Sequence, residues 1–225
     1  MKKRLLSLLL AVVLCIGLLP VGALAADGDV TVSPDDVDTN GDIIKATSFS
    51  RQGPVLTASD TNLSGKYYIV DKNMTIDGDL TIDGSQNGGL VLCEGSTLTV
   101  TGALIHTGGS SFFIYGQSYT DNGDRGTTGR LIIQNSNGDG AAIRAEGNAY
   151  NAQLGISSGV LELHGGNAGK LIDGVYLYST AKIHKGTLDD TSVFSLSATE
   201  WNKFSLDGEK LVIEYCEHEH YDDQE

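Results

Sequence analysis

Proline is nearly absent from this chain of 225 residues, and none follows residue 54. The three prolines are Pro20, Pro34 and Pro54. Because proline has no backbone N–H, a proline inside a strand that is paired on both sides would remove a hydrogen bond from the ladder. The long proline-free stretch therefore favours a fold whose strands are hydrogen-bonded along both edges.

Positive charge is also scarce. The chain has 15 Lys and Arg against 29 Asp and Glu, a formal net charge of −14, and without residues 1–25 the count is 12 against 29, or −17. A protein that binds nucleic acid needs cations to neutralise phosphates, so no nucleic-acid partner is expected. The excess of acidic residues favours solubility as its explanation, with calcium binding as the alternative. No other cofactor is expected.

Cysteine is equally sparse, with three in the chain. Cys15 lies in the N-terminal apolar run, and Cys93 and Cys216 are far apart in the sequence. A disulfide between the last two would require the C-terminal tail to return along the fold. We therefore expect free thiols.

Only the N-terminus contains a long apolar run. Lys2-Lys3-Arg4 precedes the apolar residues 5–19, and Ala23-Leu24-Ala25 places small residues where a signal peptidase cleaves. Residues 1–25 are therefore predicted to be a secretory signal peptide, and the mature protein is expected to be secreted, extracellular or at the cell surface. No later stretch is long and apolar enough to span a bilayer, so no membrane partner is expected after cleavage.

Short clusters of strand-forming residues recur along the chain at nearly constant spacing. Six clusters start 23, 22, 19, 23 and 21 residues apart, at 67–70, 90–93, 112–115, 131–134, 154–157 and 175–178. A repeat of about 21 residues with Gly-rich turns is typical of stacked coils. We predict an all-β fold, a right-handed parallel β-helix (β-solenoid) with about 21 residues per coil. An antiparallel β-sandwich is the alternative, and it would need no constant period.

Strand alternation predicts which side chains point into the coils. One inner column is expected to contain Leu92, Ile114, Ile133, Ile156 and Leu177. A second, fainter strand series is expected to contribute Ile82, Val100, Ile143, Leu163 and Ile183. Outside this second series, Glu162 would lie beside Lys182 and His164 beside His184 on neighbouring coils.

The same pattern divides the chain into four segments. Residues 1–25 are the signal peptide, 26–65 a polar linker and N-terminal cap, 66–210 the parallel β-helix, and 211–225 an acidic tail that contains histidine. A cap is expected because a repeat fold must shield its first coil from solvent.

Two segments contain side chains that ligate metals. Cys216, His218 and His220 alternate along the tail and would face one side of an extended strand as zinc ligands, although structural zinc sites usually have four ligands. Asp121 and Asp124 could ligate calcium, but their segment lacks the ligand spacing of an EF-hand loop. A solvated tail and ordinary turn chemistry are the alternatives.

Aromatic side chains occupy the positions of the first strand series that we expect to face outward. Tyr68, Phe113 and Tyr176 share one position, and Tyr115 and Tyr178 lie two residues further along their strands. Rows of exposed rings bind sugars by apolar stacking supplemented by hydrogen bonds. These five residues are therefore the predicted ligand-binding set, unless the cap or an insertion covers them. No catalytic residue is identified, which favours a protein that is not an enzyme.

Three segments share a wider pattern: the run from Gly65-Lys66-Tyr67-Tyr68 through 75–78, then 90–100 and 113–117. Together they resemble the β-helix modules of secreted surface proteins from anaerobic Gram-positive bacteria. The resemblance covers about residues 60–190 and is most specific at 90–117. It implies an adhesin-like, carbohydrate-binding role with a polysaccharide or cell-wall glycan as partner. A polysaccharide lyase or glycoside hydrolase and a non-catalytic structural stalk are the alternatives.

Overall fold

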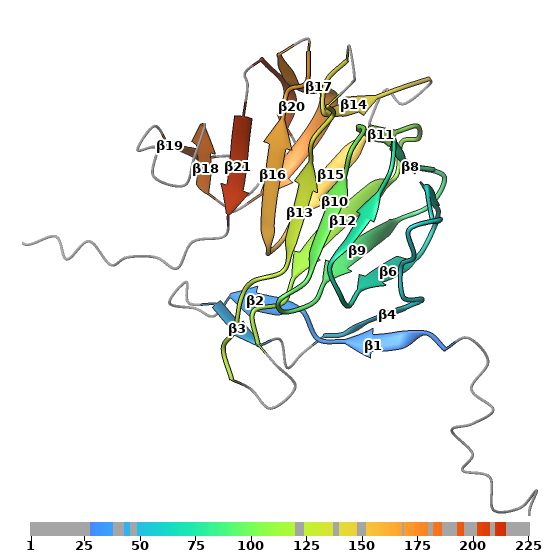
Figure 1. Cartoon of the computed structure of the whole chain (residues 1–225), viewed down its shortest axis with the longest axis vertical. Helices are drawn as coiled ribbons and strands as arrows, with labels where there is room; N and C mark the ends of the chain where they lie inside the picture. Colours follow the sequence, from blue (N-terminus) through green and yellow to red (C-terminus); the bar gives the residue numbers. More distant parts are fainter. Residues whose placement is uncertain are drawn as a thin grey trace, which may run out of the picture.

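All regular elements in the described part of the chain are β-strands (Figure 1). The computed structural model describes residues 28–37, 43–45, 49–119, 124–136, 140–147, 152–167, 169–179, 182–185, 193–195, 202–207 and 210–214. The predicted signal peptide lies outside these residues. Among them, none forms a helix that could cross a membrane.

The larger sheet has ten strands, nine in one continuous parallel order and a tenth, β20, that pairs antiparallel beside it. Its order is β5 (Asn62–Leu63), β8 (Leu80–Ile82), β11 (Leu104–His106), β14 (Ile143–Ala145), β17 (Lys170–Ser179), β15 (Gln153–Ile156), β12 (Ser111–Gly116), β9 (Gly88–Leu92) and β6 (Tyr67–Val70). β20 (Asn202–Asp207) pairs antiparallel with β17. The long strand β17 pairs with both β14 and β15, so it joins the two halves, and the sheet curls until it nearly closes into a barrel.

The smaller sheet has seven strands. Its order is β19 (Val193–Ser195), β18 (Lys182–Lys185), β21 (Lys210–Glu214), β16 (Val160–His164), β13 (Arg130–Ile133), β10 (Thr97–Val100) and β7 (Met74–Ile76). The strands from β7 to β16 are parallel, and β21, β18 and β19 continue the sheet antiparallel. The predicted tail therefore begins with four residues of β21, which pair with β16 and β18.

Both sheets enclose one aliphatic core. Ile114 pairs with Leu90 on one side and Ile156 on the other, while Leu98 and Leu131 face the same core from the smaller sheet. All five side chains are buried. Burial of a Leu or Ile side chain stabilises a fold by about 1.5–3 kcal/mol, so this core is the main source of stability.

Side-chain oxygens fix the register at three turns. The backbone N–H groups of Thr97, Ala103 and Ser111 each donate to a side-chain oxygen of the residue 24 positions earlier. The acceptors are Asn73, Asp79 and Asn87, and the distances are 2.7–3.0 Å. Each bond satisfies a donor at a strand end, where the ladder supplies no partner.

The prediction of a right-handed parallel β-helix with about 21 residues per coil is wrong. Paired residues lie 24 apart between Met74 and Leu98, but 42 apart between Phe112 and Leu154. The apparent period arose because one cluster, 131–134, belongs to β13 in the smaller sheet, whereas the others belong to the larger sheet. The long connections after β12 break any constant repeat, and the sheet curls into a nearly closed barrel with antiparallel strands at its C-terminal end.

The predicted inner columns are wrong for the same reason. Ile114 and Ile133 are both fully buried, as expected, but they lie in different sheets. Ile133 pairs with Val100 and Leu163, which were assigned to the second column. Strand alternation therefore identified which side chains are buried and failed to identify their neighbours.

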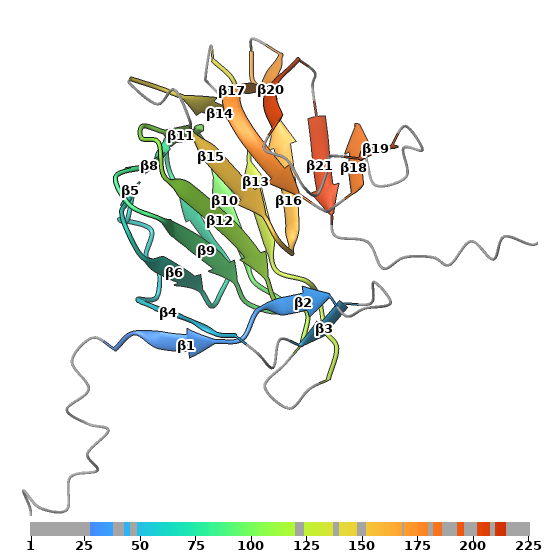
Figure 2. The same cartoon turned by 180° about the vertical axis from the view of Figure 1, so that it is seen from behind.

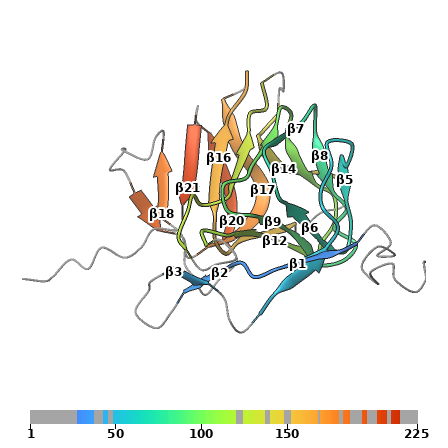
Figure 3. The same ribbon diagram turned by 60° about the horizontal axis from the view of Figure 1, so that its bottom comes forward.

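Four short strands at the N-terminus form two separate pairs. β1 (Val30–Val32) pairs with β4 (Arg51–Gly53), and β2 (Asp35–Val37) pairs with β3 (Ile43–Lys45). Neither pair joins a large sheet, and Figure 3 shows β1 and β2 passing below β9 and β12. The described residues among 28–53 are called the N-terminal strap below.

Candidate ligand-binding face

Aromatic residues and glycines alternate in one row across the outer face of the larger sheet. Tyr67 is in register with Gly89, Gly89 with Phe113, Phe113 with Gly155, and the backbone of Gly155 with that of Tyr178. Figure 2 shows the strands that contribute them, β6, β9, β12, β15 and β17, side by side. We call this the aromatic-glycine row.

The glycines make room for the rings. A Cβ atom at Gly155 would collide with the ring of Phe113, and one at Gly89 would lie 2.9 Å from the ring of Tyr67 and collide with the carbonyl oxygen of Phe113. Each ring therefore lies over the glycine of a neighbouring strand.

A row of uncharged polar side chains runs beside the aromatic-glycine row. Ser111 pairs with Gln153, and Gln153 pairs with Tyr176. Asn87 extends the row, since its side chain accepts the Ser111 N–H at 3.0 Å, and the Ser111 hydroxyl donates to the side-chain oxygen of Gln153. Asn87 is exposed and the other three are half-buried. We call these four residues the neutral polar row.

The N-terminal strap covers a third row, on the other side of the aromatic-glycine row. Ile69, Val91 and Tyr115 are buried together with Val32 of β1, and Phe49 packs against them. The strap is anchored at its other end by Asp35, whose buried carboxylate accepts the Ser118 N–H at 2.9 Å and the Ser118 hydroxyl at 2.6 Å. Burial raises the pKa of Asp35, and the Ser118 hydrogen bonds partly oppose that rise.

Arg51 occupies a cage of three aromatic rings at the edge of the strap. Its guanidinium carbon lies 4.8 Å from the ring centres of Phe49 and Tyr115 and 5.0 Å from that of Tyr67. Nη2 donates to the Tyr115 hydroxyl at 2.9 Å and Nη1 to the Ser50 carbonyl at 3.2 Å. Nε is buried and has no hydrogen-bond partner among the described residues, and the three rings surround the guanidinium group.

The structure separates the five predicted ligand-binding residues. Phe113 and Tyr176 are half-buried on the outer face, and Tyr178 continues the aromatic-glycine row by its backbone, its side chain lying outside the description. Tyr115 is only 7% exposed because the strap covers it, as the alternative interpretation anticipated.

The outward orientation predicted for Tyr68 is wrong. Tyr68 is 6% exposed and packs in the main core, and its hydroxyl accepts the Ser64 N–H at 3.2 Å. Its neighbour Tyr67 faces outward instead. A shift of one residue exchanges the two faces of a strand. At β6 the sequence pattern was read one residue out of step, so Tyr68 was assigned the outward position that Tyr67 occupies. Two glycines in the strand clusters, Gly89 and Gly155, could have indicated the aromatic-glycine row, since each lies in register with an aromatic residue.

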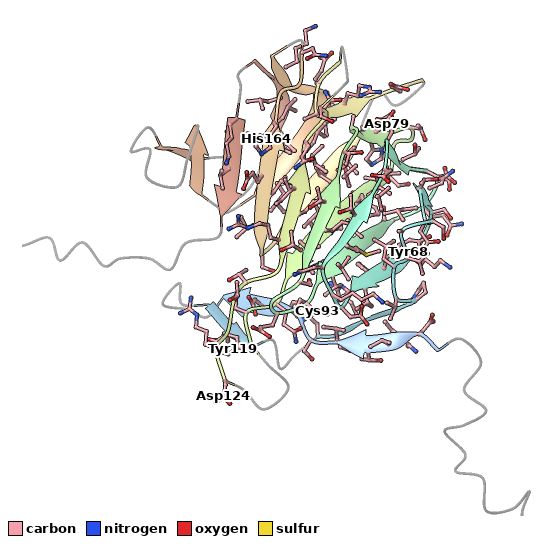
Figure 4. All side chains as sticks on the ribbon, in the orientation of Figure 1. Tyr68, Asp79, Cys93, Tyr119, Asp124 and His164 are labelled. Carbon is pink, nitrogen blue, oxygen red and sulfur yellow. The ribbon has the colours of Figure 1, made fainter. Side chains whose placement is uncertain are left out.

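A second polar cluster lies on the smaller sheet, where Figure 4 labels His164 on β16. The Glu162 carboxylate, 12% exposed, lies 2.6 Å from Lys210 Nζ, 2.8 Å from His164 Nε2 and 3.3 Å from Arg130 Nη1. Burial raises the pKa of Glu162, but hydrogen bonds from Lys210 and His164 outweigh it and hold the pKa below its ordinary value. The cluster links three strands of the smaller sheet by ion pairs, since Arg130 lies on β13, Glu162 and His164 on β16, and Lys210 on β21.

The predicted pairing of Glu162 with Lys182 is wrong. β21 lies between β16 and β18, so Val212 pairs with Glu162 on one side and with His184 on the other. Lys210 supplies the cation that Lys182 was expected to supply. The neighbouring strand could not be identified from a parallel repeat because β21 runs antiparallel.

The predicted metal ligands are not assembled into a site by the described residues. Asp124 is exposed on the loop labelled in Figure 4, whereas Asp121 and the tail residues Cys216, His218 and His220 lie outside the description. Within the described ranges, no three His, Cys, Asp or Glu side chains gather closely enough to hold a metal ion.

Comparison with known proteins gives no relative. No family model, no curated protein and no solved structure matches the chain.

Proposed function

We propose that the protein is a non-catalytic module, exported to the cell surface or beyond, that binds polysaccharide through the outer face of its larger sheet. The observation that carries this proposal is the Phe113 ring, half-buried and laid over Gly155, with Gln153 and Tyr176 beside it in register. A flat ring next to amide and hydroxyl groups matches a sugar, which has an apolar face and a rim of hydroxyls.

The sheet makes this face suitable for an extended ligand. The two rows run across β9, β12, β15 and β17, which are held by parallel ladders over a buried core. Their side chains are therefore fixed before a ligand arrives, which reduces the entropy lost on binding. One ring contributes about 0.5–1.5 kcal/mol beyond area burial, so useful affinity requires several contacts along a chain.

The N-terminal sequence supports export, because Lys2-Lys3-Arg4, the apolar run and Ala23-Leu24-Ala25 have the form of a signal peptide. The resemblance to secreted surface proteins of anaerobic Gram-positive bacteria supports an adhesin-like role. Binding is preferred to hydrolysis because glycosidases use two carboxyl groups at a defined separation. In the described cluster, Glu162 is a single carboxylate, already engaged by Lys210, His164 and Arg130.

The test is depletion of the mature protein by a panel of insoluble and arrayed polysaccharides. Phe113→Ala combined with Tyr176→Ala should weaken binding at least about tenfold, or 1.4 kcal/mol, at a temperature where circular dichroism shows the variant to be folded. Thr75→Ala is the matched control, since Thr75 is exposed on β7 of the other sheet. Unchanged binding by the double variant would exclude this face. If the parent binds nothing in the panel, the structural stalk becomes the better proposal.

A further inference from the structure

The N-terminal strap covers one side of the proposed binding face. We infer, on the basis of the proposed function, that the strap is a displaceable cover that regulates this face. In the closed form it holds Arg51 over the rings of Tyr67 and Tyr115, and in the open form these two rings join Phe113 in stacking on the polysaccharide. Strap and polysaccharide therefore compete for the same rings, and opening of the strap raises the affinity.

The covered rings are continuous with the open one. The ring centre of Tyr115 lies 6.1 Å from that of Tyr67 and 6.1 Å from that of Phe113. The ring of Tyr67 lies over Gly89 of β9, the strand between β6 and β12. Tyr67 and Phe113 are half-buried, whereas the strap buries Tyr115. Opening of the strap therefore extends the row of available rings from Phe113 without any change in the sheet.

Arg51 occupies the place where a sugar would stack. Its guanidinium carbon lies 4.8 Å from the ring centre of Tyr115 and 5.0 Å from that of Tyr67. A ring face accommodates one group at such a distance, either a cation or the apolar face of a sugar. Phe49, on the same segment of the strap, completes the cage around the guanidinium. A sugar can reach these faces only when the strap carries Arg51 and Phe49 away from the sheet.

The strap can detach while the larger sheet stays intact. Among the described residues, β1 and β4 pair with each other, β2 and β3 do the same, and no ladder joins either pair to a large sheet. Backbone bonding to the larger sheet begins at Pro54, whose carbonyl accepts the Ile69 N–H at 2.9 Å. Figure 2 shows β4 beside β6, the edge strand that contains Ile69. The residues before Pro54 can therefore move without breaking a strand of the sheet.

Closure of the strap buries two ionisable groups. Asp35 is buried against Ser118, and burial raises the pKa of its carboxyl. Nε of Arg51 is buried with no hydrogen-bond partner among the described residues. Desolvation of such groups costs free energy that their contacts return only in part. The closed form is therefore held by a modest net free energy, and a polysaccharide that binds the open form better can shift the equilibrium.

Variants that loosen the strap test the inference by isothermal titration calorimetry. The probes are the soluble hexasaccharides cellohexaose, xylohexaose, mannohexaose and chitohexaose. Arg51→Ala should raise the affinity for the probe that binds the parent best at least about fivefold, because more of the protein is open. Val32→Ala should also raise it, since Val32 packs in the buried cluster under the strap and its loss leaves the Arg51 cation in place. In the Arg51→Ala background, Tyr67→Ala should cancel the gain, while the control Thr75→Ala should match the parent.

Hydrogen exchange supplies the reciprocal measurement. If opening favours the polysaccharide, then by linkage the polysaccharide must favour opening. Saturation of the parent with the same hexasaccharide should therefore speed amide exchange at 30–32 and 51–53 several-fold, while amides of β9 and β12 keep their protection. A ligand that makes the strap amides exchange more slowly would contradict the inference, because the strap would then be closed in the complex.

The outcomes separate this inference from the proposed function. If a hexasaccharide binds the parent through Phe113, and its affinity is unchanged in variants whose strap amides exchange faster, the inference is wrong and the face remains the binding site. If neither Arg51→Ala nor Val32→Ala speeds strap exchange, the strap is not displaceable and the inference is wrong. If no hexasaccharide binds the parent or Arg51→Ala, the inference is also wrong, and depletion by the polysaccharide panel decides the proposed function separately. Binding that is insensitive to Phe113→Ala would exclude the proposed face as well.

Discussion

Replacing Arg51 by alanine should loosen the N-terminal strap from the sheet. The guanidinium contacts Phe49, Tyr67 and Tyr115 and donates a hydrogen bond to the Tyr115 hydroxyl. The strands of the strap form no backbone ladder with either large sheet. A two-stranded pair on its own is at best marginally stable. Backbone hydrogen bonds to Ile69 begin at Pro54, directly after the strap, so residues 28–53 themselves depend on side chains such as Arg51, Val32 and Asp35.

The expected loss can be worked from these contacts. Three partly desolvated cation–π contacts contribute about 0.5–1 kcal/mol each, and the hydrogen bond adds about 1 kcal/mol. Because the contacts share one guanidinium they do not add fully, which leaves about 2–3 kcal/mol. Two to three kcal/mol corresponds to a change of roughly thirty- to one-hundred-and-fiftyfold in the equilibrium between the attached and detached strap.

Native-state hydrogen exchange measures that equilibrium directly. In Arg51→Ala, amides of 28–37 and 49–53 should exchange about thirty- to one-hundred-and-fiftyfold faster, while amides of β9, β12 and β15 should keep their protection. Arg51→Lys should lie between the parent and the alanine variant, because lysine keeps the charge but has no planar fork to stack on the rings. If strap exchange in Arg51→Ala is unchanged, Val32 and Asp35 hold the strap and the cage contributes little.

Three further predictions concern stability. Glu162→Gln should lower the free energy of unfolding in urea by about 1–3 kcal/mol near neutral pH and by less in acid. The lowered pKa of Glu162 gives stability that is present above pH of about 4.5 and is lost as pH falls. An equal loss at all pH values would contradict this. Burial lowers the pKa of His106, so stability should fall as pH drops below 6.5, and His106→Leu should flatten that dependence in the same titration. Gly155→Ala should displace the Phe113 ring at a cost of about 1–3 kcal/mol in melting experiments, and a variant as stable as the parent would show that the ring does not lie over Gly155.

The sequence predicted burial better than it predicted neighbours. Alternation along a strand depends only on local geometry, so the inward positions of Ile114 and Ile133 were correct. Which strands pair depends on the length of the connections between them. The 42-residue interval from Phe112 to Leu154 cannot be recognised from an average spacing, and β13 was placed in the wrong sheet for that reason.

The candidate site was predicted in outline only. Phe113 and Tyr176 are half-buried on the outer face, where the sequence placed them, but Tyr68 was taken for Tyr67 because one residue decides which face a side chain occupies. The cage around Arg51 could not be predicted. It joins Phe49 of the strap to Tyr115, 66 residues later, through side chains alone, and no local pattern encodes such a contact.

The most direct measurement of the proposed binding face is an NMR titration of the mature, isotope-labelled protein with a soluble oligosaccharide of the polysaccharide that depletes it. Amide shift changes should be concentrated at Gly89, Phe113, Gly155 and Tyr176, and the amide shifts of Thr99 and Glu162 on the smaller sheet should not change. Shift changes centred on the smaller sheet, or none at a ligand concentration that saturates polysaccharide-dependent depletion, would contradict it.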